Sequence, residues 1–501
     1  MFHRQRNSAG PARCLCALSI LISNAAIIWA ANPRDFLTIT QIEDDDPQTD
    51  DLGRAKAHIN AASYKTQSLT TVGDYQFTSY YHSDGKLLVG RRNVVKNPKV
   101  WTLLRTQFTS ININDAHNVS SLAIDGDGFL HIAWGVHANP LLYTRSTASL
   151  LNDDPMRLIG ANEGNAGCLA DAIPLQNAPV TYPEFYNIPN SGDLLLTYRT
   201  GHSGNGEFQL VRWDNATKSW SGIHASQAPD DEDPQPWIDD NYSGDALPNV
   251  SAYYNKLVFD AKRRFHVTWS WRTGGDSTTG FKDYQSNHNL MYAYSDNEGV
   301  DWHRSDGSLY QRNGKHDIDE DNAPPVINIP EGSSLINQSS STIGPDGKFY
   351  TATWWAPDAD TGNHLRQYML IEHDGLQWKT HQVGNRNPEN DQKRVPESQS
   401  PKFSLRRPIV MVDKDNRVLL VLSDYQRGGG ITIAYSENDR RDDWQFIDLT
   451  TERMGRWDPT YDLNRWQRDG ILSILYQPSG LGKKAEPVSV LEWNARAYFD
   501  K

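Results

Sequence analysis

One strand pattern returns seven times along the chain, and this repetition limits the folds that the sequence can adopt. Each copy starts at a polar turn, most of them containing Asp or Gly, and continues as alternating apolar residues rich in aromatic and β-branched side chains. The copies lie at 84–89, 127–132, 192–198, 262–269, 346–354, 415–421 and 469–476. Alternation with a period of two indicates half-buried β-strands, and the turn residues before each run are typical of hairpins.

The spacing of these copies favours a β-propeller. Neighbouring copies lie roughly 40 to 85 residues apart, which fits blades of four strands joined by loops of variable length. Long amphipathic helical windows are nearly absent. A β-sandwich or a β-helix is the alternative, but seven blade-sized repeats fit neither well. We therefore predict an all-β, seven-bladed β-propeller that forms a single domain.

The N-terminal region is predicted to be a signal peptide over residues 1–30, with three arginines, an apolar run over 15–28 and a small-residue cleavage site. Residues 31–55 are polar and acidic, which predicts a flexible acidic leader. The propeller is expected over 56–501, with a strand at 488–493 closing its last blade. We expect a secreted monomer, located in the periplasm or outside the cell.

Charge and cysteine content exclude several classes of protein. The formal net charge of −13 argues against a nucleic-acid-binding surface, and no apolar stretch after the signal peptide could span a membrane. Two of the three cysteines lie in the signal peptide, and Cys168 alone remains. Because no internal disulfide can form, a large apolar core must stabilise the fold, and Cys168 is expected to be a buried structural residue.

Two histidines flank the second copy of the strand pattern. Asp115-Ala116-His117-Asn118 stands in the loop before this unit, and His137 follows the end of its strand. Two imidazoles held by one short supersecondary unit suit proton transfer, because histidine titrates near neutral pH. For each histidine, a surface or turn-capping role is the alternative.

Further candidate residues stand at strand ends. Tyr182 precedes Pro183, which predicts an extended backbone at the tyrosine. Arg199 ends a strand beside a glycine-rich loop, and Arg272 repeats the Arg-Thr-Gly arrangement one blade later. Propellers present ligand-binding groups at such positions, although a solvated charge is the alternative reading.

The sequence lacks the motifs of several other chemistries. It has no GxSxG elbow, HExxH helix, Walker loop or cysteine-rich metal site. The acidic clusters at 230–233 and 317–321 are interpreted as solvated loops rather than calcium sites. No cofactor is needed for the chemistry considered below, and a structural calcium or zinc ion is compatible with the sequence but is not predicted.

Several blocks resemble BNR-repeat-type propeller proteins, which include polysaccharide lyases acting on ulvan. The resemblance is carried by the DAHN…DGDGFLHIAW…H unit, YPEF…LLLTYRTG, AYYNKLVFDAKRRFHVTWSWR and YDLNRWQRDGILSILYQ. It extends in scattered blocks over most of the chain from residue 75 to residue 480, and the spacing is most similar to that of ulvan lyase families with seven-bladed propellers. Some members of these families bind a structural zinc ion through Cys and His, but the corresponding segment Asn337–Ser339 has no cysteine.

The resemblance implies an active site made of four residues: His117, His137, Tyr182 and Arg199. A further family tyrosine is assigned to Tyr253, with Tyr242 and Tyr254 as alternatives, and the expected substrate-binding residues are Tyr253, Arg272 and Asn118. The implied reaction is β-elimination from a uronate. Arg199 would neutralise the carboxylate, His117 would be the base and Tyr182 the acid, or the reverse, and His137 would bind the carboxylate or orient the pair.

The implied substrate is ulvan, a sulfated polysaccharide containing uronate, cleaved between rhamnose-3-sulfate and glucuronate or iduronate. A local basic groove is then expected, with four candidate residues: Arg145, Arg199, Arg212 and Arg272. Two alternatives remain open. One is an exo-acting rhamnosyl-glucuronate lyase or α-L-rhamnosidase acting on plant gum side chains, and the other is a non-catalytic carbohydrate-binding propeller.

Overall fold

The computed structural model describes most of the chain from residue 31 onward. The described residues are 31–42, 54–56, 67–160, 173, 179–204, 206–223, 250–274, 285–310, 318–320, 322–387, 405–437, 439–455, 458, 460–478 and 485–501. The expected signal peptide, Cys168, Tyr242 and the acidic cluster at 230–233 lie outside them. Within the described part of the chain, no helix is long and apolar enough to cross a membrane.

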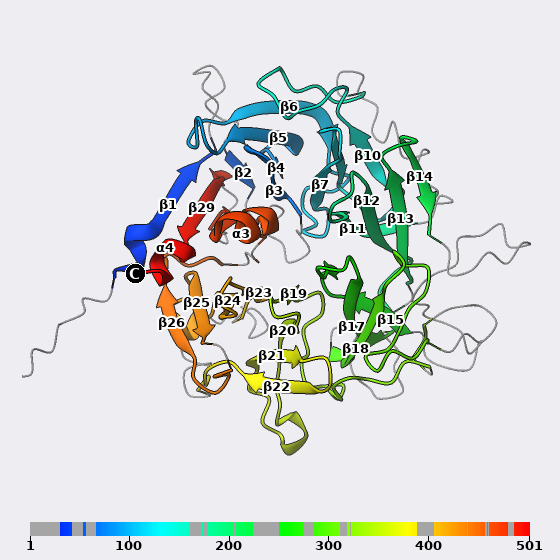
Figure 1. The fold of residues 1–501 in the computed structure, drawn as a ribbon, viewed down its shortest axis with the longest axis vertical. Helices are drawn as coiled ribbons and strands as arrows, with labels where there is room; N and C mark the ends of the chain where they lie inside the picture. Colours follow the sequence, from blue (N-terminus) through cyan, green and yellow to red (C-terminus); the bar gives the residue numbers. More distant parts are fainter. Residues whose placement is uncertain are drawn as a thin grey trace, which may run out of the picture.

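Seven antiparallel sheets surround a central axis, which confirms the predicted seven-bladed propeller (Figure 1). Blade 1 contains β3 (Leu69–Val72), β4 (Tyr75–Tyr81), β5 (Lys86–Asn93) and β6 (Thr102–Thr109). Blade 2 contains β7 (Ser120–Ile124), β8 (Leu130–Trp134) and β10 (Leu142–Arg145). Blade 3 contains β11 (Val180–Asn187), β12 (Leu194–Thr200), β13 (Phe208–Asp214) and β14 (Ser219–Gly222), with β9 (His137–Asn139) added beside β11.

The remaining blades follow in chain order around the ring. Blade 4 contains β15 (Val250–Tyr254), β16 (Val258–Phe259), β17 (Phe265–Thr273) and β18 (Asn287–Ser295). Blade 5 contains β19 (Ser340–Ile343), β20 (Phe349–Trp355), β21 (Gln367–His373) and β22 (Trp378–Gln382). Blade 6 contains β23 (Ile409–Val412), β24 (Val418–Leu422), β25 (Thr432–Ser436) and β26 (Gln445–Asp448). Blade 7 contains β27 (Ile471–Tyr476), β29 (Ser489–Asn494) and β1 (Leu37–Gln41).

The other elements are short. The α-helices are α3 (Leu463–Asp469) and α4 (Ala495–Phe499), the 3-10 helices are η1 (Pro33–Phe36), η5 (Ala359–Thr361) and η7 (Tyr425–Arg427), and β2 (Arg54–Lys56) pairs with β28 (Ala485–Pro487).

Both ends of the chain close the ring. The predicted closing strand is confirmed as β29, which pairs with β27 on one side and with β1 on the other. The expectation of a flexible leader over 31–55 is wrong for its first part, because residues 33–41 form η1 and β1. The side chain of Ile42 is fully buried, and its amide donates to the Val488 carbonyl oxygen at 2.8 Å. Covering the edge of β29 in this way leaves fewer unpaired backbone groups.

The strand pattern that revealed the repeats occupies the same place in six of the blades. In blades 2 to 7 it coincides with the strand that lies second from the central axis. These strands are β8, β12, β17, β20, β24 and β27, the last of which lies beside a bridge from Tyr461 to Ile474. The copy at 84–89 instead falls on β5, the third strand of blade 1. The second strand of blade 1 is β4, which follows a Gly-Asp turn at 73–74 and shows the same alternation.

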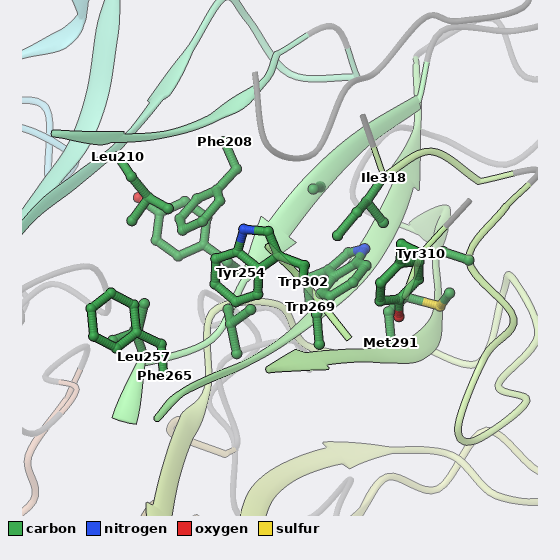
Figure 2. Packing of buried hydrophobic residues seen from close by; sticks show 14 of the residues in the cluster. Phe208, Leu210, Tyr254, Leu257, Phe265, Trp269, Met291, Trp302, Tyr310 and Ile318 are labelled. Carbon is green, nitrogen blue, oxygen red and sulfur yellow. The ribbon is translucent and has the colours of Figure 1, made fainter. Parts of the chain in front are cut away.

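The apolar core lies between neighbouring blades. Figure 2 shows one of its clusters, in which side chains of blades 3 and 4 pack together. Trp269 and Trp271 of β17 are fully buried there, and the Phe208 and Tyr254 rings lie 4.3 Å apart. Burying large aromatic side chains contributes about 1.5–3 kcal/mol for each of them, so these inter-blade layers stabilise the ring without disulfides.

A turn with an Asp-box-like sequence follows β18. The Asn297 side-chain oxygen accepts from the Asp301 amide, and Ser295 Oγ accepts from the Gly299 amide, each at 2.8 Å. Trp302 is then buried in the cluster of Figure 2, and His303 pairs with Tyr294. The two hydrogen bonds from the Asp301 and Gly299 amides close the turn.

The antiparallel order gives the propeller two different faces. On the upper face, each innermost strand begins and each second strand ends, as at the start of β11 and the end of β12. On the lower face, tight turns join these two strands. A cavity of about 430 Å³ opens on the lower face between such turns and the helices α3 and α4, and none of the candidate residues named above lines it.

Candidate active site

Four candidate residues meet on the upper face where blades 2 and 3 adjoin. His117 lies in the loop before β7, and Arg199 lies near the end of β12. His137 begins β9, which leaves blade 2 and pairs with β11, so that His137 stands opposite Thr181, the neighbour of Tyr182. This strand exchange between blades brings together residues that lie far apart in the sequence.

A single carboxylate holds both histidines. Asp115 Oδ1 lies 2.6 Å from His117 Nδ1, and Asp115 Oδ2 lies 2.6 Å from His137 Nδ1. The two imidazole rings stack, with centroids 4.1 Å apart and planes inclined by 21°. The His117 amide also donates to Asp115 Oδ1 at 3.0 Å, which fixes the loop around the carboxylate.

The charges in this group are set by its contacts. Burial opposes ionisation of Asp115, but hydrogen bonds from the His117 amide and from both imidazoles hold the pKa of Asp115 at about 2. Burial, together with the neighbouring His137 and the positive charge of Arg407, lowers the pKa of His117, although Asp115 opposes this shift. At neutral pH His117 is therefore an uncharged imidazole, the form that can accept a proton.

Tyr182 adopts a backbone conformation that differs from the expected one. The proline after it predicted an extended residue, but φ of Tyr182 is 58°, at a β-bulge between Thr181 and Glu184. The Tyr254 hydroxyl donates to the Tyr182 carbonyl oxygen at 3.0 Å and supports this conformation. Left-handed φ values outside glycine are costly and are found preferentially at functional sites. The Tyr182 ring centroid lies 6.1 Å from that of His117.

Arg199 packs against two tyrosines. The residue is only 2% exposed, and its guanidinium carbon lies 5.1 Å from the Tyr182 ring centroid and 4.7 Å from that of Tyr253. Within the described part of the chain, Arg199 Nε and Nη1 are buried without a hydrogen-bond acceptor. Unsatisfied donors of a buried cation are costly, so a bound anion at this position would be stabilised.

The glycine-rich loop after β12 allows this packing. A Cβ atom on Gly206 would lie 2.3 Å from the Thr200 carbonyl oxygen and 3.2 Å from Arg199 Nε. A larger residue at this position would push the loop away from the guanidinium. The glycine is therefore required by close approach and not by a turn.

Tyr253 extends the site into blade 4. Its hydroxyl lies 2.9 Å from Ser203 Oγ and accepts from Arg272 Nη1 at 3.2 Å, while the Arg272 guanidinium carbon lies 4.1 Å from its ring centroid. Burial opposes ionisation of this phenol, but Arg272 and Arg199 together lower its pKa below the usual value of 10.0. Tyr253 contacts Arg199 and Arg272, whereas Tyr254 is also buried and supports the backbone of Tyr182.

The comparisons with known proteins agree with this architecture. The sequence matches the BNR repeat-containing family over residues 75–386, a span that contains all the candidate site residues. The chain belongs to this family. No protein with a curated description matches the chain.

Solved structures share the fold of this BNR-repeat protein. The crystal structure of polysaccharide lyase Uly1 matches with a TM-score of 0.62 at 14% identity, covering 91% of this chain and 97% of that chain. A PL25 ulvan lyase matches with a TM-score of 0.59 at 12% identity, covering 87% and 93%. A PL25 ulvan lyase bound to -[GlcA(1-4)Rha3S]- matches with a TM-score of 0.58 at 12% identity, covering 87% and 95%. At such identities, the similarity establishes the fold.

Asn118 was predicted to bind substrate, but its side chain is buried. It is 1% exposed, and its backbone amide donates to the Asp115 carbonyl oxygen at 3.1 Å. Its side-chain oxygen has no hydrogen-bond donor within the described part of the BNR-repeat protein. Asn118 therefore lies beneath the histidine pair and closes the loop that carries it.

Sequence reasoning gave no role to Arg407, which faces the site from blade 6. Its guanidinium donates to the backbone and side-chain oxygens of Asn337 at 2.6 and 2.8 Å, and to Asp458 at 3.2 Å. Its charge is one cause of the lowered pKa of His117. The sequence could have indicated Arg407 by its position just before the innermost strand of a blade, because His117 has the same position.

The four arginines proposed for a basic groove do not lie together. Arg199 and Arg272 belong to the site, where they flank Tyr253. Arg212 forms ion pairs with Asp193 and Glu298 near the lower face, and Arg145 lies over the rings of Phe129 and Trp213. The prediction is thus wrong for Arg145 and Arg212.

Two positions were tested for their fit to a metal ion. Asp115, His117 and His137 offer ligand atoms that lie within 4.8 Å of one another, but the 2.6 Å separations between nitrogen and oxygen are those of hydrogen bonds. Ligands about 2.0–2.1 Å from a zinc ion would stand further apart. At Asn337, in the segment that the sequence resemblance relates to a zinc site, the side-chain oxygen accepts from the Arg407 guanidinium, a neighbour that repels a cation. Neither position fits a bound metal as it stands.

Proposed function

We propose that this BNR-repeat protein is a secreted polysaccharide lyase that cleaves a uronate-containing polysaccharide by β-elimination, with ulvan as its substrate. The observation that carries the proposal is the meeting of an uncharged imidazole, two phenols and a buried arginine with unpaired donors at one place on the upper face. The shared fold with lyases that act on ulvan agrees with it.

The difficult step is removal of the C5 proton, which lies α to a carboxylate. Negative charge develops on that carboxylate as the proton leaves, so a cation that binds it lowers the barrier. Arg199 has the unpaired donors for this contact, and guanidinium binds carboxylates with two parallel hydrogen bonds. The Tyr182 and Tyr253 rings both pack against the guanidinium and hold it in place.

The proton transfers are assigned to His117 and Tyr182. Neutral His117 accepts the C5 proton, the C4–O4 bond breaks, and the electron pair of the C–H bond becomes the second bond between C4 and C5. Tyr182 donates its phenolic proton to the departing O4, which leaves a free hydroxyl on the neighbouring sugar. The Tyr182 ring stands beside the His117 ring, so one sugar residue could reach both groups.

Charge on the upper face suits an anionic chain. Arg272 comes from blade 4, and Arg407, whose charge acts on His117, comes from blade 6. Their position would guide sulfate and carboxylate groups of a polyanion toward the site in a protein whose net charge is −13. A KM that rises with ionic strength is the expected consequence.

Product analysis tests the proposal. Elimination breaks the C4–O4 bond without water, so mass spectrometry of the ulvan products should show unsaturated uronate ends that lack the elements of one water molecule. Only saturated products, which contain that water, would instead identify a hydrolase. Saturation is the readout because ¹⁸O from labelled water also enters a reducing end by exchange of the anomeric hydroxyl. Release of rhamnosyl-linked end units from gum side chains, without depolymerisation of ulvan, would favour the exo-acting alternative. Binding without any product would favour the carbohydrate-binding propeller.

A further inference from the structure

We infer that Asp115 is a positioning residue that sets the same tautomer in both histidines of the site. The inference concerns a residue that has no role in the elimination scheme above, and its kinetic part rests on that scheme. It follows from one geometric fact. Each oxygen of a single carboxylate receives the Nδ1 atom of a different imidazole, at 2.6 Å in both cases.

The tautomers follow from the chemistry of the carboxylate. An ionised carboxylate can only accept hydrogen bonds, so both Nδ1 atoms must carry a proton. In an uncharged imidazole with a proton on Nδ1, the lone pair is on Nε2. Asp115 thus makes Nε2 the basic nitrogen of both His117 and His137, on the side of each ring away from the carboxylate. The chain uses one acid to orient two bases.

The loop holds Asp115 in place for this task. Its Oδ1 atom also accepts from the His117 amide, and its backbone carbonyl accepts from the buried Asn118. The carboxyl side chain is 24% exposed and the two imidazoles are 31% and 35% exposed. The carboxylate is therefore more enclosed than the rings that it orients, as expected for a group that supports the reacting residues from below.

The stacking of the rings adds a second consequence. With centroids 4.1 Å apart, two imidazolium ions would repel each other, and one carboxylate compensates only one positive charge.

The substitution Asp115→Asn separates orientation from simple packing. An amide of the same shape can accept from one Nδ1 atom, but it must donate to the other, which forces the proton of that ring onto Nε2. One of the two histidines is then reversed. Asp84→Asn is the matched control, because Asp84 Oδ1 lies 2.8 Å from His82 Nδ1 in a similar Asp–His pair outside the site.

The test is ¹⁵N NMR spectroscopy of the histidine side chains in the purified protein. The signals are assigned from the variants His117→Gln and His137→Gln. We expect Nδ1–H tautomers for both rings in the wild type, one reversed ring in Asp115→Asn, and unchanged signals for both in Asp84→Asn. On ulvan, Asp115→Asn should lower kcat about 100-fold or more while KM changes little. Both rings as Nε2–H tautomers, or tautomers unaffected by Asp115→Asn, would overturn the inference.

A metal ion is the competing explanation for the same three side chains. Treatment with EDTA should leave the spectra and the activity of the wild type unchanged. Tightly bound zinc that disappears in Asp115→Asn, together with histidine signals that change on chelation, would also overturn the inference. If the wild type has no lyase activity at all, the proposed function fails, but the tautomer spectra still decide the role of Asp115.

Discussion

The His117 and His137 rings stack with their centroids 4.1 Å apart, although one belongs to the loop before blade 2 and the other to a strand paired with blade 3. Neither blade alone contains the pair. The site therefore depends on the short strand β9, which crosses between the two sheets and brings His137 to the start of β11. Ala138 of this strand has a φ of 52°, a second strained residue beside Tyr182.

The pH dependence of catalysis should report the environment of His117. Its pKa is lowered, in part by Arg407, and the uncharged form is the proposed base. Activity should therefore persist below pH 6.5 and fall as the pH drops through this lowered pKa. In Arg407→Gln the pKa of His117 should rise, so the acidic limb of kcat/KM should move to higher pH. An unchanged limb, or a shift to lower pH, would contradict this assignment. Arg427→Gln, which removes a surface ion pair with Asp448 in the same blade, is the control.

Arg199 should tolerate no substitution, even a conservative one. Lysine keeps the charge but loses the planar fork and the stacking on Tyr182 and Tyr253. We expect Arg199→Lys to lower kcat/KM by about 10²–10³-fold, as for the loss of one donor to a developing anion. Arg212→Lys, on the lower side of blade 3, should retain full activity. Circular dichroism and thermal unfolding verify that both variants are folded, and near-native turnover by folded Arg199→Lys would refute the proposed role.

Tyr253 should ionise more readily than an ordinary tyrosine. Two arginines lower its pKa below 10.0, whereas burial raises the pKa of the neighbouring Tyr254. Because a lowered pKa favours the phenolate, the ultraviolet difference spectrum between the wild type and Tyr253→Phe should show tyrosinate below pH 10. A phenol that titrates at or above pH 10 would mean that the two guanidinium groups do not act on Tyr253.

The N-terminal strand should contribute to stability in a way that depends on burial. Ile42 is fully buried where the chain enters the ring, while Ile39 on β1 is 45% exposed. We expect Ile42→Ala to lower the free energy of unfolding by about 2–4 kcal/mol and Ile39→Ala by less than about 0.5 kcal/mol. Chemical denaturation measures both values. Equal effects would indicate that the segment from β1 to Ile42 does not pack along β29 as described.

Much of the fold could be predicted because it depends on local patterns. Period-two alternation after polar turns identified the second strand of six blades, and the apolar run at 488–493 identified the closing strand. The partner of that strand was missed because 31–55 was treated as one acidic segment. Its acidic run begins at Glu43, two residues after β1, and β1 itself pairs along the edge of β29 in blade 7.

The residues of the candidate site could be named from the sequence, but their arrangement could not. Spacing and resemblance selected His117, His137, Tyr182 and Arg199, which the structure brings together. The backbone of Tyr182 was not predictable, because the preference imposed by Pro183 is overridden by a bulge and by the Tyr254 hydrogen bond from another blade. The separation of Arg145 and Arg212 from the site depends on where each residue lies along its strand, which composition does not reveal.

The most direct measurement is ultraviolet absorbance while the purified protein is incubated with ulvan. Elimination creates a double bond conjugated with the uronate carboxylate, so the account predicts rising absorbance with the wild type and almost none with folded Arg199→Lys. A flat trace with folded wild-type protein, or equal rates for the two proteins, would contradict it.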